Sequence, residues 1–311
     1  MDVVDWLLDS DPAIRWQVMR DLLDEPKAVV ARERSRVAVE GWGARLLDLQ
    51  GPDGHWGGAA FVPRAWISTL DTLQLLRDLG VDPTSDRMRR AIVQVRDRCT
   101  WGKGFGDSPF FEGEVEPCIN GRVLGLGAYF GEASDRLADR LLGAQLSDGG
   151  WNCDAPPSRR SSFHTTINVL EGLLEYERAT GPRADATAAR LRGQQFLLER
   201  RLFRSRSTGQ PIVHDRKTKS AAAWTELSFP TRWHYDILRA LDYLREAGAA
   251  PDERTAEAVE LVRTKRDQHG RWPLENPHPG RAHFEMEGRS GEPSRWNTLR
   301  ALRVLRWANA A

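Results

Sequence analysis

Two cysteines and one histidine are the residues of this chain whose types best suit metal chemistry. Cys118 and His164 each stand at the start of a segment with helical spacing of apolar residues, and Cys153 lies in the polar stretch between them. Thiolate and imidazole are ligands that Zn²⁺ prefers, and three protein ligands with an open fourth position are typical of catalytic zinc. A helix N-terminus also stabilises a thiolate. The set predicts a site for one zinc ion.

Two carboxylates accompany this set. Glu116 precedes Cys118 by two positions and Asp154 directly follows Cys153. We expect them to serve as a fourth ligand, as a hydrogen-bond partner of a ligand or as catalytic groups. The alternative is structural, with each cysteine a small buried apolar residue and His164 a hydrogen-bonded core histidine.

A second set of candidates surrounds His234, in the segment Pro230–Asp236. Its position at the start of a predicted helix makes His234 a candidate general acid or base. Arg232 and Trp233 are predicted substrate contacts. The alternative is that His234 is a structural cap of the helix.

A third set lies near the C-terminus, where Ser294 is a typical N-cap. Glu285 and Glu287 are predicted acids facing a cavity, Arg295 an anion clamp and Trp296 a substrate contact. The alternative is a solvated loop with a surface salt bridge. The three sets can form one functional site only if the fold brings them together.

A recurring turn indicates that fold. Gln50–Gly57 and Gln145–Asn152 share the pattern Gln-x-x-Asp-Gly-x-Trp, and Gln268–Pro273 is a degraded third copy. Asp-Gly favours a turn because Asp bonds the backbone ahead of it and Gly tolerates positive φ. Each copy separates two amphipathic segments, which is typical of an array of helical hairpins. We expect Trp56 and Trp151 to pack between hairpins without contacting substrate.

Apolar spacing predicts eleven helices, with no long strand-like alternation. One helix covers about 12–24. The others form pairs of an outer, Arg-rich helix with an inner, more apolar one: 36–50 with 64–79, 84–99 with 117–130, 134–146 with 162–178, 187–201 with 228–246, and 252–266 with 294–309.

Such alternation predicts an all-α fold that either stacks as an open solenoid or closes into an α/α toroid. We expect the closed toroid, with five to six hairpins and parallel inner helices. We expect one domain over 1–311, with 1–30 packing on the toroid. Long loops fall where an outer helix leads to an inner one, at 100–116, 147–162, 202–227 and 267–293. All of them reach one mouth, where we expect the active site and a mostly apolar pocket.

Composition limits the partners. The chain has 311 residues, a net charge of +1 and interspersed charges, which argues against a nucleic-acid partner. We expect a cytoplasmic protein, because the acidic start lacks the basic region of a signal peptide and no apolar run could span a bilayer. The expected partner is a small-molecule substrate.

The Gln-x-x-Asp-Gly-x-Trp turns resemble the repeat of squalene and terpene cyclases and of protein-prenyltransferase β subunits, over nearly the whole chain. The resemblance implies the α/α toroid. Two departures argue against squalene cyclisation: Asp9-Ser-Asp11 is the closest approach to the Asp-x-Asp-Asp acid of class II cyclases, and the length permits one toroid only.

The metal candidates carry a further resemblance. Glu116-Pro-Cys118 and Phe163-His164-Thr165 look like the segments that supply zinc ligands in prenyltransferase β subunits, and a set of two cysteines and one histidine is similar to the zinc site of lanthionine cyclases. The resemblance implies Zn²⁺ bound by Cys118, Cys153 and His164.

Three functions remain open from the sequence. The first is a zinc-dependent enzyme acting on an apolar, terpenoid-like or thiol-containing small molecule. The second is a non-catalytic toroid that binds an apolar ligand or a protein, with a structural metal site. The third is a metal-free terpene cyclase that uses another acid.

Overall fold

The computed structural model describes residues 2–212 and 224–310, so the predicted crossing 202–227 lies partly outside the described residues. Thirteen α-helices and two short 3₁₀ helices occur in these ranges, together with four strands of two residues each. The prediction of an all-α chain is confirmed. Within the same ranges, no helix is both long and apolar enough to cross a membrane.

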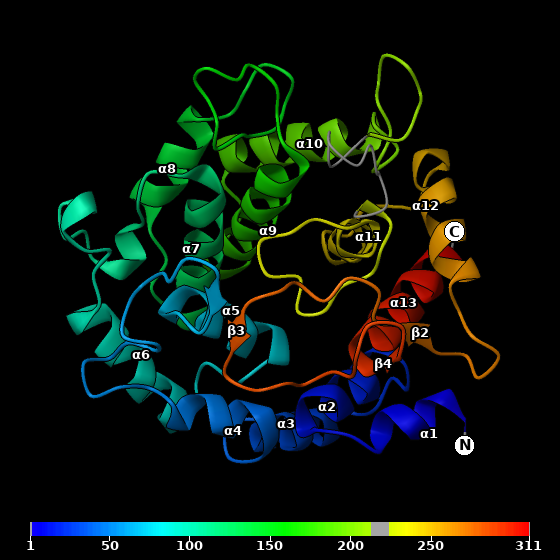
Figure 1. Ribbon diagram of the computed structural model, residues 1–311, viewed down its shortest axis with the longest axis horizontal. Helices are drawn as coiled ribbons and strands as arrows, with labels where there is room; N and C mark the ends of the chain where they lie inside the picture. Colours follow the sequence, from blue (N-terminus) through cyan, green and yellow to red (C-terminus); the bar gives the residue numbers. More distant parts are fainter. Residues whose placement is uncertain (1, 213–223, 311) are drawn as a thin grey trace.

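Six inner helices surround the centre of the molecule (Figure 1). Residues from the later turns of all six line one central cavity, so the helices run parallel and begin at the same end, which we call the mouth. The inner helices are α2 (Pro12–Asp21), α5 (Thr69–Leu79), α7 (Pro117–Phe130), α9 (Phe163–Thr180), α11 (Ile237–Glu246) and α13 (Arg295–Ala308).

The ring closes between its first and last inner helices. Arg303 on α13 donates a hydrogen bond to Gln17 on α2 and lies 2.6 Å from Asp21 at the end of α2. On the other side of α2, the indole N–H of Trp16 donates to the carbonyl of Leu79 on α5 over 3.0 Å. The closed toroid is therefore confirmed, and the N-terminal segment supplies one of its inner helices.

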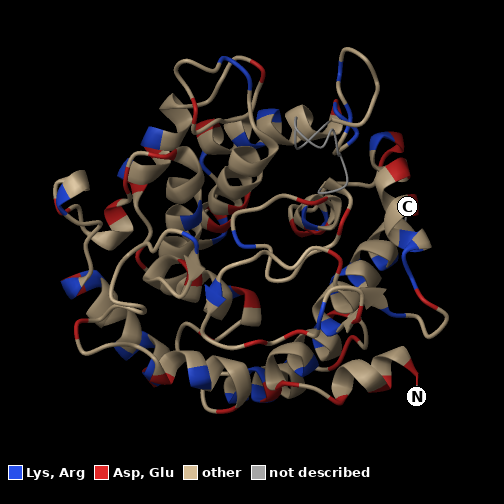
Figure 2. Cartoon of the chain, viewed as in Figure 1, with Lys and Arg blue, Asp and Glu red and all other residues tan. Residues whose placement is uncertain are grey.

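Lys, Arg, Asp and Glu residues are interspersed along the outer helices (Figure 2). Five outer helices alternate with the inner ones along the chain, and α1 and α3 pack against α2. The outer layer consists of α1 (Val3–Leu8), α3 (Lys27–Arg36), α4 (Gly41–Asp48), α6 (Asp86–Arg98), α8 (Asp135–Gly143), α10 (Ala184–Leu198) and α12 (Glu253–Thr264).

The three recurring turns, which follow α4, α8 and α12, join these outer helices to the next inner helix by the same two bonds. The Trp151 backbone N–H donates to the Thr166 hydroxyl over 3.1 Å, and its indole N–H to the Leu141 carbonyl over 2.7 Å. Trp56 and Trp272 bond in the same way, and all three rings are fully buried. The prediction that Trp56 and Trp151 pack between hairpins is confirmed.

Two predicted helix boundaries are wrong. The predicted helix 36–50 is divided, because Gly41 takes a φ of +64° after α3 has ended at Arg36. The predicted helix 228–246 begins only at Ile237. Pro230 lacks an N–H and Arg232 has a left-handed φ of +55°, so neither continues a helix. With α1 and α3 included, the described residues contain two more helices than predicted.

Four short strands connect the loops at the mouth. β1 (Ala65–Trp66) pairs in parallel with β3 (Arg281–Ala282), and β2 (Trp272–Pro273) pairs antiparallel with β4 (Pro293–Ser294). The loop between β2 and β4, which we call the cap loop (274–292), therefore crosses from the start of α13 to the loop that precedes α5 (Figure 1).

Candidate functional site

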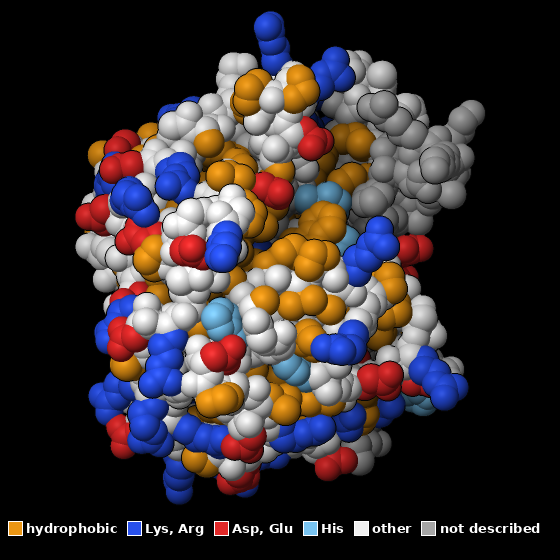
Figure 3. Space-filling model, turned by 60° about the vertical axis from the view of Figure 1, so that its left-hand side comes forward, with side chains coloured by type: hydrophobic (Ala, Val, Ile, Leu, Met, Phe, Trp, Pro, Cys, Tyr) orange, Lys and Arg blue, Asp and Glu red, His pale blue; other side chains and the backbone are white. Residues whose placement is uncertain are grey.

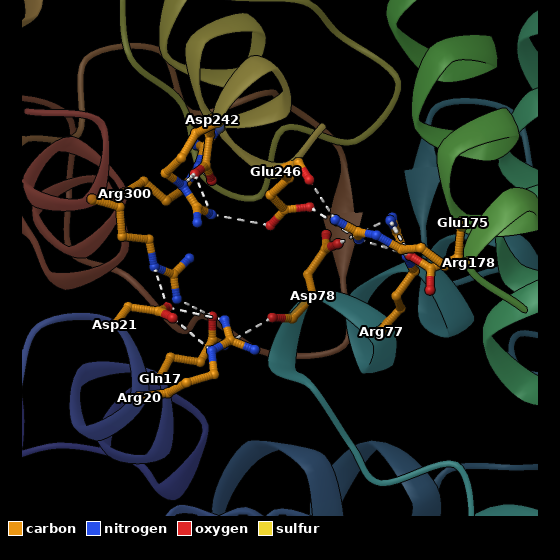
Figure 4. Close-up of polar contacts among 12 residues, drawn as sticks. Gln17, Arg20, Asp21, Arg77, Asp78, Glu175, Arg178, Asp242, Glu246 and Arg300 are labelled. Atoms are coloured by element: carbon orange, nitrogen blue, oxygen red, sulfur yellow. Dashed lines mark hydrogen bonds and ion pairs between the residues drawn. The ribbon is translucent and has the colours of Figure 1, made fainter. Parts of the chain in front are cut away.

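Ion pairs surround a central space at the end of the barrel opposite the mouth (Figure 4). Arg77 lies 3.2 Å from Glu175, and Arg178 lies 3.6 Å from Glu246. These groups line a central cavity of about 310 Å³, whose walls carry Arg, Asp and Glu from all the inner helices except α7. This cavity is polar because the inward faces of the later helical turns are charged, and the expectation of a mostly apolar pocket concerns the mouth instead.

The mouth brings together part of the predicted metal set. Ligand atoms of Glu116, Cys118 and Cys153 all lie within 4.8 Å of one another. Cys118 is in the first turn of α7, and Glu116 is the residue before Pro117, at the N-cap position. Cys153 follows the turn of Trp151, which is fixed to α9. We call these three residues the thiol cluster.

Hydrogen bonds favour a thiolate at Cys153. Its sulfur accepts from the Cys118 backbone N–H and from the Thr165 hydroxyl, each over 3.4 Å. The neighbouring Cys118 thiol and the Thr165 hydroxyl lower the pKa of Cys153 against the effect of burial. The adjacent Cys153 sulfur and burial raise the pKa of Cys118, whose sulfur lies 3.6 Å from a carboxylate oxygen of Glu116. The Cys118 thiol therefore holds its proton more firmly than the Cys153 thiol does.

His164 does not belong to the thiol cluster. Its Nδ1 accepts a hydrogen bond from the backbone N–H of Tyr235 over 2.8 Å. A neutral imidazole has one lone pair and one N–H, so the proton is on Nε2, which then cannot coordinate a metal. Among the described residues, Glu116 is the third potential ligand beside the two sulfurs. Asp154 is exposed and lies outside this group as well.

His234 lies in an aromatic cluster instead of at a helix start. Its ring stacks at 3.8 Å on Trp233 and at 3.7 Å on His278, and it meets His164 edge-on at 5.5 Å. Helix α11 begins three residues later because the Asp236 carboxylate caps it, accepting from the Arg239 backbone N–H. On the face drawn in Figure 3, histidine side chains lie among hydrophobic ones.

A second cavity, of about 460 Å³, lies beneath the cap loop. Its walls include the apolar side chains of Trp66, Leu75, Phe229 and Phe284. The Trp66 indole N–H donates to the Pro279 carbonyl over 3.1 Å and so joins the loop before α5 to the cap loop. We call this space the cap cavity. Its volume and mixed lining suit a small molecule.

Three ionisable side chains of the cap cavity are partly or fully removed from solvent. Arg232 is only 8% exposed, and burial lowers the pKa of its guanidinium to about 10, so it stays charged at neutral pH. Burial raises the pKa of Glu287 to about 7. Burial and the charge of Arg232 lower the pKa of His283, whose Nε2 lies 2.9 Å from the Thr72 hydroxyl.

The remaining candidates from the sequence fall in different places. Glu285 lines the cap cavity. Arg295 lies over the ring of Trp6 and donates to backbone carbonyls of α1 and the residue after it, outside the linings of both cavities. Trp296 is buried and stacks on Phe229 at 4.4 Å. The predicted anion clamp is therefore a link between α13 and α1.

His283 and a buried ion pair are functional candidates that the sequence did not predict. Arg122 on α7 lies 2.7 Å from the Asp71 carboxylate on α5, and both side chains are almost fully buried. A single arginine in the otherwise apolar segment 117–130 is a signal that could have indicated this pair. No comparable signal marks His283.

No protein-family model matches the sequence, and a search of curated proteins finds no match. The chain is similar to the solved structure of the type II terpene cyclase MstE from Scytonema without ligand, at 18% identity and a TM-score of 0.46, covering 97% of this chain and 89% of that one. A protein from Actinoplanes gives 17% identity and a TM-score of 0.45, with 96% and 90% covered. At these values the matches carry no argument about activity.

Proposed function

We propose that this protein is a metal-dependent enzyme that acts on a small molecule at the mouth of the barrel. The observation that carries the proposal is the thiol cluster. Glu116 and Cys118 stand at the start of α7 and Cys153 stands in the loop before α9, yet their ligand atoms all lie within 4.8 Å of one another. Two sulfurs and one carboxylate are a suitable donor set for Zn²⁺, and three ligands leave a position for substrate. A bound zinc ion supplies Lewis acidity or binds a substrate thiol.

The protein's own groups support this assignment. Donors at 3.4 Å from the Cys153 sulfur stabilise its thiolate before any metal arrives. Two loop segments reach the cluster, so a metal bound there links the start of α7 to the loop before α9. We propose a terpenoid-like or thiol-containing small molecule as the substrate, since a bound zinc ion can activate a thiol or polarise an oxygen substrate.

Metal analysis tests the proposal. The parent, loaded with zinc and dialysed, is expected to retain one equivalent, and Cys118→Ser, Cys153→Ser and Glu116→Gln are each expected to lose it. Cys99→Ala is the matched control, because this thiol is 1% exposed in the core and burial raises its pKa to about 12. The proposal is contradicted if the parent retains no zinc. It is also contradicted if Cys99→Ala loses zinc while the three cluster variants keep it.

Chelation separates a catalytic from a structural metal. A catalytic ion is expected to leave with the helices intact, whereas unfolding of the mouth on chelation favours the non-catalytic toroid with a structural site. Circular dichroism and the protection of mouth amides from hydrogen exchange distinguish these results.

A metal-free acid catalyst is the second candidate, and Glu287 favours it. This carboxyl lies in the lining of the cap cavity, and its raised pKa keeps part of the population protonated near neutral pH. Activity that survives Cys118→Ser but is lost in Glu287→Gln supports this candidate over the metal-dependent one.

A further inference from the structure

Arg232 is a buried cation in the wall of the cap cavity. The side chain is 8% exposed, and its guanidinium makes no hydrogen bond or ion pair with the residues that the structure describes. Its charge lies over the ring of Trp66, at 5.3 Å from the ring centre. Burying a charge without a partner costs free energy, so a protein that retains one gains something else from it.

The charged groups around Arg232 are already engaged. Asp71 is paired with Arg122 at 2.7 Å and also accepts from the Ser68 hydroxyl. Glu287 accepts the Trp296 backbone N–H at the start of α13 over 3.0 Å. The other charged members of the cavity lining, Glu285 and Arg289, are exposed, so solvent screens them. Among the residues that the structure describes, one positive charge is therefore left unbalanced in the lining of the cavity.

The backbone places this charge at a conformational cost. Arg232 has a φ of +55°, which is unfavourable for a residue with a side chain. Its carbonyl and that of His234 accept hydrogen bonds from Arg239, and Arg239 is held by Glu171 at 2.7 Å. A buried ion pair on the inner helices thus fixes the loop that directs Arg232 to the cavity.

We propose that Arg232 binds the carboxylate of a monocarboxylic ligand whose apolar body lies in the cap cavity. A single unbalanced cation matches a single negative charge, and a planar guanidinium matches a carboxylate in bidentate geometry. The acids Glu285 and Glu287 in the same lining disfavour a multiply charged anion. The apolar body contacts Trp66, Phe229 and Phe284. This ligand class goes beyond the metal-dependent function and does not depend on a bound metal.

Calorimetric titration with octanoate, octanol and inorganic phosphate tests the inference. Octanoate is expected to bind the parent at least tenfold more tightly than octanol or phosphate do. Arg232→Met is expected to lose at least tenfold in octanoate affinity and, without ligand, to melt above the parent because a buried unpaired charge is gone. Arg232→Lys keeps the charge and is expected to bind weakly. Arg90→Met, an exposed change on outer helix α6, is the control and is expected to bind like the parent.

Several outcomes overturn the inference. The parent does not bind octanoate, or it binds octanol or phosphate as tightly as octanoate. The inference also fails if Arg232→Met binds octanoate as tightly as the parent does. The titration is repeated in Cys118→Ser. Unchanged octanoate binding there shows that this site stands even if the metal proposal fails, whereas loss of binding there contradicts its independence from the metal.

Discussion

The backbone N–H of Tyr235 donates to Nδ1 of His164 across 2.8 Å, and this bond joins the start of α9 to the loop that precedes α11. Tyr235 is 2% exposed, and its hydroxyl donates to the Leu202 carbonyl over 2.5 Å. His164 therefore positions an irregular segment that also carries Arg232 and His234. The bond fixes the imidazole tautomer and separates His164 from metal binding.

His164→Ala is expected to destabilise the fold and to leave zinc content unchanged. The substitution leaves the buried Tyr235 N–H without an acceptor, which costs about 1–3 kcal/mol. Urea unfolding measures the loss, and metal analysis on the same sample measures zinc. A variant as stable as the parent but free of zinc would restore His164 as a ligand.

Trp151→Ala is expected to cost about 3–5 kcal/mol, the usual loss for a large buried aromatic side chain. The ring is 0% exposed, and its indole bond to Leu141 holds α8 to the turn. Thr166→Val is a graded control, since it removes only the hydroxyl that accepts the Trp151 backbone N–H. Denaturant unfolding should rank the parent first, Thr166→Val second and Trp151→Ala last.

The repeat of the turns made the fold predictable, because turn chemistry and helical spacing are local properties. Gln50 and Gln145 show this in detail: each donates to its own turn and to a carbonyl of the next outer helix. The alternation of outer and inner helices suits an open solenoid as well as a closed ring, and it is the contacts between α13 and α2 that close the ring. The sequence predicts that the inner helices are more apolar than the outer ones, but it does not show that the charges of Arg77, Asp78 and Glu175 face a central cavity.

The candidate site was predictable in composition but not in geometry. Cys118 and Cys153 meet because the turn at Trp151 and the start of α7 are both set by local signals. The hydrogen bond of His164 depends on the path of residues 228–236, which contain its partner Tyr235. This segment is not helical, because Arg232 has a left-handed φ, and no turn motif in the sequence announces that. The sequence could not show that Tyr235 would take the Nδ1 lone pair, since the two residues are far apart along the chain.

Asp71→Asn is expected to cost about 3–5 kcal/mol, because removing one partner of a buried ion pair leaves the other charge uncompensated. The uncompensated charge would be Arg122, whose side chain is 3% exposed. The double variant Asp71→Asn with Arg122→Met is expected to recover most of the loss, since no unpaired charge remains. Equal stability of the single and double variants in urea would contradict this account.

Glu287 is expected to make stability fall as pH rises. Burial raises the pKa of this carboxyl from its usual 4.5 to about 7 in the folded chain. Between these values the folded state holds a proton that the unfolded state releases, so the contribution is fully present below pH 4.5 and is lost as pH rises through 7.

The lost contribution is at most about 3 kcal/mol, from the free energy of one pKa unit. Glu287→Gln cannot titrate and keeps an oxygen that accepts the Trp296 N–H, so its stability relative to the parent should rise across this window and stay constant outside it. Urea unfolding of both proteins from pH 4 to pH 8 measures the difference. A constant difference across the series would show that the carboxyl has the same pKa in the folded and unfolded chain. It would then be ionised at neutral pH and could not be the acid that the metal-free mechanism requires.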